Sequence, residues 1–128
     1  MRVALDTNIV VRFLTSDDEQ QALAARQLIE DADEIVISTI VLCETAWALS
    51  SGYRYPARAL ADALRLLIDM QGVEVDRPVA EAGLKMLREG GDFADGCILV
   101  EAERAKCERL ATFDKGLIKL SQGRASRP

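Results

Sequence analysis

The sequence contains no histidine, and this absence narrows the chemistry that the chain can perform. Without histidine there can be no Ser-His-Asp triad, no Cys-His pair and none of the usual zinc sites that use imidazole ligands. Any hydrolytic chemistry must therefore use carboxylates, lysine, hydroxyl groups or a bound metal ion.

Cysteine is also scarce. The three cysteines, Cys43, Cys97 and Cys107, form no CxxC motif and cannot all pair among themselves. Each lies in or at the end of an apolar helical pattern, so we expect buried, reduced thiols.

Long apolar runs are missing as well. No run approaches the ~20 residues of a membrane span. Arg2 is followed closely by Asp6, so the start lacks the basic and apolar regions of a signal peptide, and we expect a soluble cytoplasmic protein. With 128 residues, 49% of them hydrophobic, the chain fits one domain over residues 1–120. The polar segment 121–128 is expected to be a disordered tail.

The charge of the chain is unevenly distributed. The net charge is −5, and residues 1–53 hold three basic residues against nine acids, whereas residues 54–128 hold 13 against 12. This balance argues against a protein that coats DNA non-specifically. It is compatible with a metal-dependent nuclease, because a bound cation offsets clustered acids locally.

Predicted strands and helices alternate along the chain, which favours an α/β fold with a parallel sheet covered by helices on both faces. Ligands of such sheets bind beyond the carboxyl ends of the strands. The strands are expected at residues 2–5, 35–38, 73–75 and 109–112, and the helices at 9–14, 16–32, 39–51, 56–71, 78–89 and 93–106.

Four acids stand where such a site would lie. Asp6 follows the first predicted strand, Asp114 follows the last, Glu44 interrupts an apolar helix and Asp95 lies in the first turn of another helix. Each acid taken alone has another explanation: Asp6 can cap a helix, Asp114 can start a helical turn, and Glu44 can lie on a solvated helix edge. Asp92 is expected to be the N-cap of the helix that contains Asp95.

The combination of these acids favours a metal site. Like charges at one sheet edge repel each other unless a cation lies among them. Oxygen ligands without His or Cys favour Mg²⁺ or Mn²⁺ over zinc, and such ions suit phosphoryl chemistry. The sequence therefore predicts a Mg²⁺-dependent phosphodiesterase site.

Four segments carry a resemblance to a known family. "ALDTNIVVRFL", "STIVLCETAWAL", "GGDFADGCILVEA" and "LATFDKGL" resemble, in order and spacing, the four acidic motifs of the PIN-domain family. The resemblance covers residues 2 to about 120 and is greatest to free-standing PIN domains of the VapC toxin type. It implies a three-layer α/β/α domain with a short, mainly parallel sheet of about four to five strands.

The resemblance also implies an activity and a set of site residues. PIN domains bind Mg²⁺ or Mn²⁺ and cleave RNA with a metal-activated water. By position, Asp6 and Asp95 match direct metal ligands, while Glu44 and Asp114 match acids that act through water or a second ion. The supporting positions are matched by Asn8, Thr112 and Asp92, with helix capping as our main interpretation for Asp92.

The partners implied by the resemblance are an RNA substrate, a cognate antitoxin that occludes the acidic site, and a second copy of the chain in a homodimer. DNA is contacted only through the antitoxin. The candidates for RNA backbone contact are Arg54, Arg58, Arg88, Lys106 and Lys115, although each also fits a solvated helix face.

The sequence lacks residues that two other functions require. An aspartyl-phosphate phosphatase needs a second acid two residues after Asp6, where this chain has Asn8. A receiver domain needs paired acids after its first strand, which are also missing. A non-catalytic domain that binds RNA or a partner, and a housekeeping PIN nuclease, remain as alternatives.

Overall fold

Short parallel strands alternate with helices along the whole chain, which confirms the predicted α/β fold. The computed structural model describes residues 1–128 and divides into two compact units, Met1–Asp76 and Arg77–Pro128.

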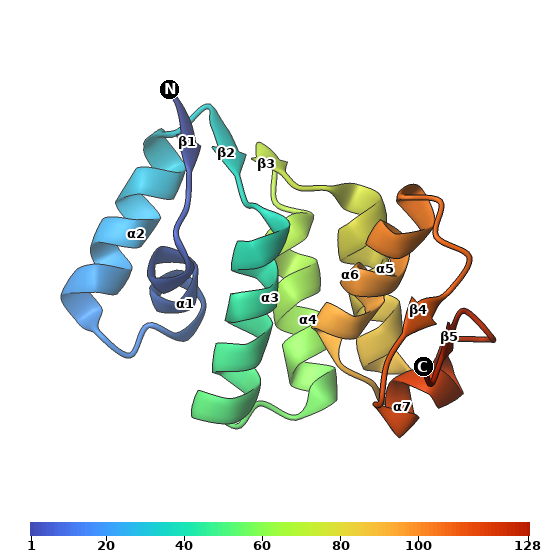
Figure 1. Cartoon of the computed structure of the whole chain (residues 1–128). Coiled ribbons are helices and arrows are strands. Elements are labelled where there is room, and N and C mark those ends of the chain that lie inside the picture. The colour runs from blue at the N-terminus through green and yellow to red at the C-terminus, as the bar shows by residue number, and fades with distance from the viewer. The chain divides into compact units, whose positions relative to one another are not determined.

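The first unit contains a three-stranded parallel sheet in the order β1-β2-β3 (Figure 1). Its strands are β1 (Arg2–Ala4), β2 (Glu34–Val36) and β3 (Val73–Glu74). In the central strand, buried Ile35 pairs with Val3 on one side and Val73 on the other. The carboxyl ends of all three strands therefore lie at one edge of the sheet.

Four α-helices accompany this sheet: α1 (Thr7–Thr15), α2 (Glu19–Asp31), α3 (Thr39–Trp47) and α4 (Ala57–Ile68). Helix α1 packs against both α2 and α3 and lies between them in Figure 1. Val10, Ala22, Leu42 and Leu64 are buried in the core. Burial of such apolar side chains is the main driving force for holding helices on a sheet.

The helix predicted over residues 16–32 begins three residues later. Helix α2 begins at Glu19 and is capped by Asp18, whose side chain accepts a hydrogen bond from the Gln21 amide at 3.0 Å. Ser16 instead ends α1 in a left-handed conformation, with φ of 56°. Helix α3 begins at Thr39, as predicted, and is capped by Ser38.

The helix predicted over residues 39–51 is divided in two. Helix α3 ends at Trp47, and the chain continues as a π-helical segment, η1 (Ala48–Gly52). The Ser51 hydroxyl donates to the Trp47 carbonyl at 2.7 Å, a local bond typical of serine in distorted helices. The Ser-Ser-Gly sequence at this end is a weak helix former, which explains why the regular helix stops early.

The second unit consists of α5 (Arg77–Arg88), α6 (Phe93–Arg104), β4 (Leu110–Ala111), α7 (Lys115–Leu120) and β5 (Ala125–Ser126). Helices α5 and α6 make the most extensive contact of this unit. A core cluster of Met86, Leu99, Leu117 and Ala125 joins the helices to β5.

Strand β5 corrects the prediction of a disordered tail over residues 121–128. It pairs in parallel with β4, and the Thr112 amide donates to the Ser126 carbonyl at 3.0 Å. Ala125 is buried in the core cluster, and Ser121 is buried too. The strand could not be predicted from the polar composition of the tail. It depends on pairing with β4, which lies more than ten residues earlier in the chain.

The cysteines agree with the sequence prediction in chemistry but not in burial. All three are free thiols. Cys97 is buried and Cys43 partly buried, but Cys107 is exposed because α6 ends at Arg104, before this residue. None of the helices is both long and apolar enough to cross a membrane.

Gly96 explains how closely α5 and α6 approach each other. A Cβ atom added at Gly96 would lie 2.2 Å from the Ala82 carbonyl oxygen and 2.9 Å from the Gly83 Cα. These are backbone atoms, which cannot move aside as a flexible side chain can. Gly96 is unfavourable for helix propensity, but its lack of a Cβ atom allows α5 and α6 to pack this closely.

We predict that Gly96→Ala lowers the free energy of unfolding by at least about 1–3 kcal/mol, because the added methyl group forces α5 and α6 apart. Gly52→Ala is the matched control, since a Cβ there meets nothing within 4 Å. It should leave stability unchanged or raise it by less than about 1 kcal/mol. Denaturant unfolding monitored by circular dichroism measures both. Equal stability of the two variants would contradict the packing role of Gly96.

Candidate acidic site

Asp6 lies at the carboxyl end of β1, where the chain turns into α1. Its backbone is extended, and its side chain accepts a hydrogen bond from the Thr7 amide at 2.8 Å. Asp6 is therefore a helix cap, one of the roles that the sequence allows for it. The side chain is still exposed, so the cap leaves it accessible to a ligand.

Thr7 connects Asp6 with Glu44. Besides its amide bond to Asp6, the Thr7 hydroxyl donates to Glu44 Oε1 at 3.1 Å. Glu44 lies in the second turn of α3 and is exposed, which agrees with the solvated helix edge considered from the sequence. The sequence offered no signal for the role of Thr7, because the bond joins residues 37 positions apart.

Asp6 and Glu44 line one open groove of about 430 Å³ in the first unit. Asn8 lines it too, but its side chain makes no hydrogen bond there, so its supporting role stays a prediction. The complete lining is Asp6, Thr7, Asn8, Val11, Arg12, Glu44, Ala48 and Tyr53. The groove thus combines two carboxylates with one cationic side chain.

The second unit brings Asp92, Asp95 and Asp114 near one another. Asp95 lies in the first turn of α6, as predicted. Partial burial raises the pKa of Asp95 above its usual value, and the negative charges of Asp92 and Asp114 raise it further. These three carboxylates therefore share one negative electrostatic environment.

The capping role predicted for Asp92 is only half correct. Asp92 occupies the N-cap position of α6, but its side chain makes no capping hydrogen bond. The backbone alone begins the helix, since the Asp92 carbonyl accepts from the Asp95 amide at 3.1 Å. The Asp92 carboxylate therefore contributes charge beside Asp95 rather than a cap.

Asp114 is fixed by two hydrogen bonds at the start of α7. Its Oδ1 accepts from the Leu117 amide, and its own amide donates to the Thr112 hydroxyl, both at 3.0 Å. Asp114 thus starts a helical turn, one of the roles considered from the sequence. Thr112 holds the backbone of the acid rather than its carboxylate.

The donor chemistry of these residues fits a hard divalent cation, since every candidate ligand is a carboxylate oxygen. The structure contains no group of three or more acidic or sulfur side chains arranged to hold a metal ion. The acids of the second unit are close enough to interact electrostatically, but they do not form a complete ligand set. The assignment of metal ligands therefore stays a prediction.

The fold is that of a small α/β protein in which Asp6 and Asp114 follow parallel strands and the other candidate acids lie in or beside helices. The chain belongs to the PIN-domain family, because the sequence profile of the PIN domain matches residues 3–122. Comparison with curated protein sequences finds no match.

A solved structure also resembles this chain. It is the crystal structure of Mycobacterium tuberculosis VapC20, described as a toxin that cleaves the sarcin–ricin loop. The two chains are 18% identical, with a TM-score of 0.44 over 91% of this chain and 92% of that chain.

We predict that Asp95→Asn stabilises the metal-free protein at pH values above the pKa that Asp95 has in the folded state. A carboxyl group with a raised pKa binds more protons folded than unfolded, so its ionisation costs stability as the pH rises through that pKa. The cost comes from partial burial first and then from repulsion by Asp92 and Asp114. Because Asp95 is only partly buried, the gain should be about 1–3 °C in Tm.

Thermal unfolding in EDTA from pH 3 to 8 measures this effect. The stabilisation should be largest at neutral pH and vanish at pH values below the ordinary pKa of aspartate. Asp62→Asn, on α4 in the first unit, is the control. A stabilisation by Asp95→Asn that does not change with pH would refute the electrostatic explanation.

Proposed function

We propose that this PIN-domain protein is a Mg²⁺- or Mn²⁺-dependent endoribonuclease that hydrolyses RNA phosphodiester bonds. The observation that carries the proposal is the grouping of the motif acids: Asp6 with Glu44 in one groove, and Asp95 with Asp92 and Asp114. Membership of the PIN-domain family supports the same activity.

The proposed roles divide between metal ligands and residues that hold them. Asp6 and Asp95 are the direct ligands, and Glu44 and Asp114 act through water or a second ion. A bound Mg²⁺ or Mn²⁺ polarises the scissile phosphate and activates a water molecule. Thr7 fixes the orientation of Glu44, as outer hydrogen bonds commonly do for acids around metal sites.

We further propose that the protein acts in the cytoplasm as the toxin of a type II toxin–antitoxin pair. The cognate antitoxin would cover the acidic groove with a basic side chain, and the toxin would form a homodimer. The exposed Arg54, Arg58, Arg88, Lys106 and Lys115 remain candidates for RNA contact. The resemblance of the four acidic motifs to VapC-type toxins supports this assignment.

We predict that the purified protein cleaves structured RNA with Mg²⁺ or Mn²⁺ and that EDTA abolishes cleavage. Asp6→Ala and Asp95→Ala should each lower the rate about 10³-fold, because each removes a ligand worth several kcal/mol of transition-state stabilisation. Gel analysis of labelled RNA measures cleavage, and Asp62→Ala, in α4, is the control.

Cleavage that persists in EDTA or in either variant would contradict the metal mechanism. The absence of cleavage by the native protein would favour a non-catalytic domain.

A second prediction concerns biological role. Expression of the protein alone should arrest growth, Asp6→Ala should be harmless at equal protein level, and co-expression of a small neighbouring reading frame should relieve the arrest. Colony counts after induction measure this. Harmless expression of an enzyme that is active in vitro would favour a housekeeping nuclease.

A further inference from the structure

Arg12 is the only basic residue among those that line the groove of Asp6 and Glu44. A groove lined by two carboxylates repels a polyanion such as RNA unless cations offset the charge. Arg12 supplies the cation in this lining, and its hydrogen bonds hold the side chain there.

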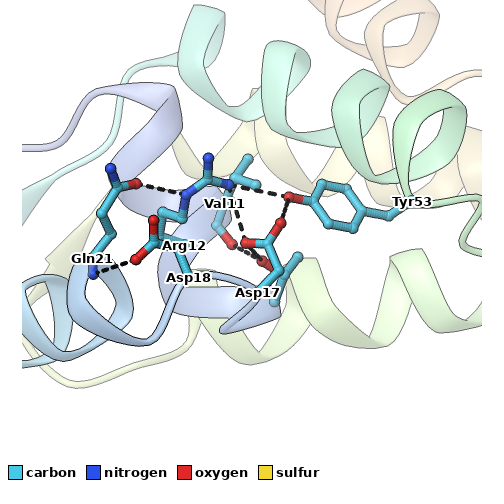
Figure 2. Close-up of polar contacts among 7 residues, drawn as sticks. Val11, Arg12, Asp17, Asp18, Gln21 and Tyr53 are labelled. Carbon is cyan, nitrogen blue, oxygen red and sulfur yellow. Dashed lines mark hydrogen bonds and ion pairs between the residues drawn. The ribbon is translucent and has the colours of Figure 1, made fainter.

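The guanidinium of Arg12 is fixed by partners from three segments (Figure 2). Its Nε donates to Gln21 Oε1 at 2.7 Å, and its Nη1 lies 3.1 Å from both Asp17 Oδ1 and the Tyr53 hydroxyl. These partners come from α2, from the loop before α2, and from the residue after η1. The Arg12 side chain is only 29% exposed, so it is held in one orientation.

Asp17 is the anchor of this network. It accepts hydrogen bonds from the Tyr53 and Thr15 hydroxyls in addition to Arg12. The bond from Tyr53, followed by the bond from Thr15 and the charge of Arg12, lowers the pKa of Asp17. Asp17 therefore stays ionised at neutral pH and keeps Arg12 in place.

One arm of the guanidinium takes no part in these contacts. Nε and Nη1 make the bonds to Gln21, Asp17 and Tyr53, whereas Nη2 makes none. Nη2 carries two N–H donors, and a planar guanidinium suits phosphate oxygens. Because the side chain is already ordered, binding a phosphate would cost less conformational entropy than with a free arginine.

The distance along α1 indicates which phosphate this arm could reach. Asp6 is the N-cap of α1 and Arg12 lies in its second turn, so their backbones are ~9 Å apart along the helix axis. This backbone spacing suits two successive phosphates of one strand better than one phosphate that contacts both residues. We therefore assign to Arg12 the phosphate next to the one at the acids.

We infer that Arg12 is a substrate-binding residue that contacts an RNA phosphate adjacent to the scissile one, and that Asp17, Gln21 and Tyr53 position it. This inference rests on the proposed ribonuclease function. In this arrangement the scissile phosphate lies at Asp6 and Glu44, and the neighbouring phosphate of the RNA backbone lies at Arg12.

The test compares Arg12→Gln, Arg12→Lys and Tyr53→Phe with the native protein on a short single-stranded RNA. Arg12→Gln should raise KM about tenfold with kcat changed less than about threefold, as expected for the loss of one charge-assisted contact. The slope of log(kcat/KM) against log[salt] should become shallower by about 0.7, the value for one phosphate of a single strand.

The other two variants separate charge from orientation. Arg12→Lys should keep the salt slope but recover only part of the affinity, because lysine lacks the planar fork. Tyr53→Phe should raise KM by a few fold with an unchanged salt slope, since it frees Arg12 without removing the charge.

Arg2→Gln is the matched control. Arg2 is also an arginine of the first unit, hydrogen-bonded to Glu34 and Glu74, but it does not line the groove. This variant should leave KM and the salt slope at native values, whatever its effect on Tm.

Two outcomes would overturn the inference, and they differ from failure of the proposed function. If the native protein cleaves RNA but Arg12→Gln lowers only Tm, with native KM and salt slope, Arg12 has a purely structural role. If Arg2→Gln changes KM and the salt slope as much as Arg12→Gln does, the effect is one of overall charge. If the native protein neither cleaves nor binds a fluorescent RNA in Ca²⁺, the proposed function itself fails.

Discussion

Electrostatic repulsion between carboxylates is the constraint on which the arrangement of this protein depends. Acids at the ends of short parallel strands must be held in place against the charges of their neighbours. Asp6 and Asp114 are each held by an amide at a helix N-terminus, where the helix dipole also favours negative charge. Glu44 is held by the Thr7 hydroxyl. Partial burial raises the pKa of Asp95, and the neighbouring charges of Asp92 and Asp114 raise it further.

The sequence predicts those parts of the fold that depend on local pattern. Four strands and most helices follow from alternating apolar segments, and their bounds shift by only a few residues. Strand β5 could not be predicted, because its two residues acquire their structure by pairing with β4 and by burying Ala125. The early end of α3 was also missed, although its Ser-Ser-Gly segment carried a weak signal.

The candidate site shows the same division. The sequence points to the candidate acids because carboxylates at strand ends and in apolar helices are costly to leave uncompensated. Thr7, Tyr53 and Asp17 were missed, since their roles depend on bonds between segments distant in the sequence. Arg12 did carry a signal: a charged residue within "IVVRFL" must find partners or solvent, and the structure provides both. The N-cap position of Asp92 could be predicted from the sequence, but the lack of a capping hydrogen bond from its side chain could not.

The groove of the first unit must satisfy two opposite electrostatic demands if it processes RNA. Carboxylates that attract a divalent cation also repel the phosphates of the substrate. A mobile surface lysine would relieve the second demand but could also pair with Asp6 or Glu44 and compete with the cation. Arg12 avoids this competition, because its guanidinium is already bound by Asp17, Gln21 and Tyr53. A fixed cation near fixed acids thus keeps opposite charges available in one small groove without their neutralising each other.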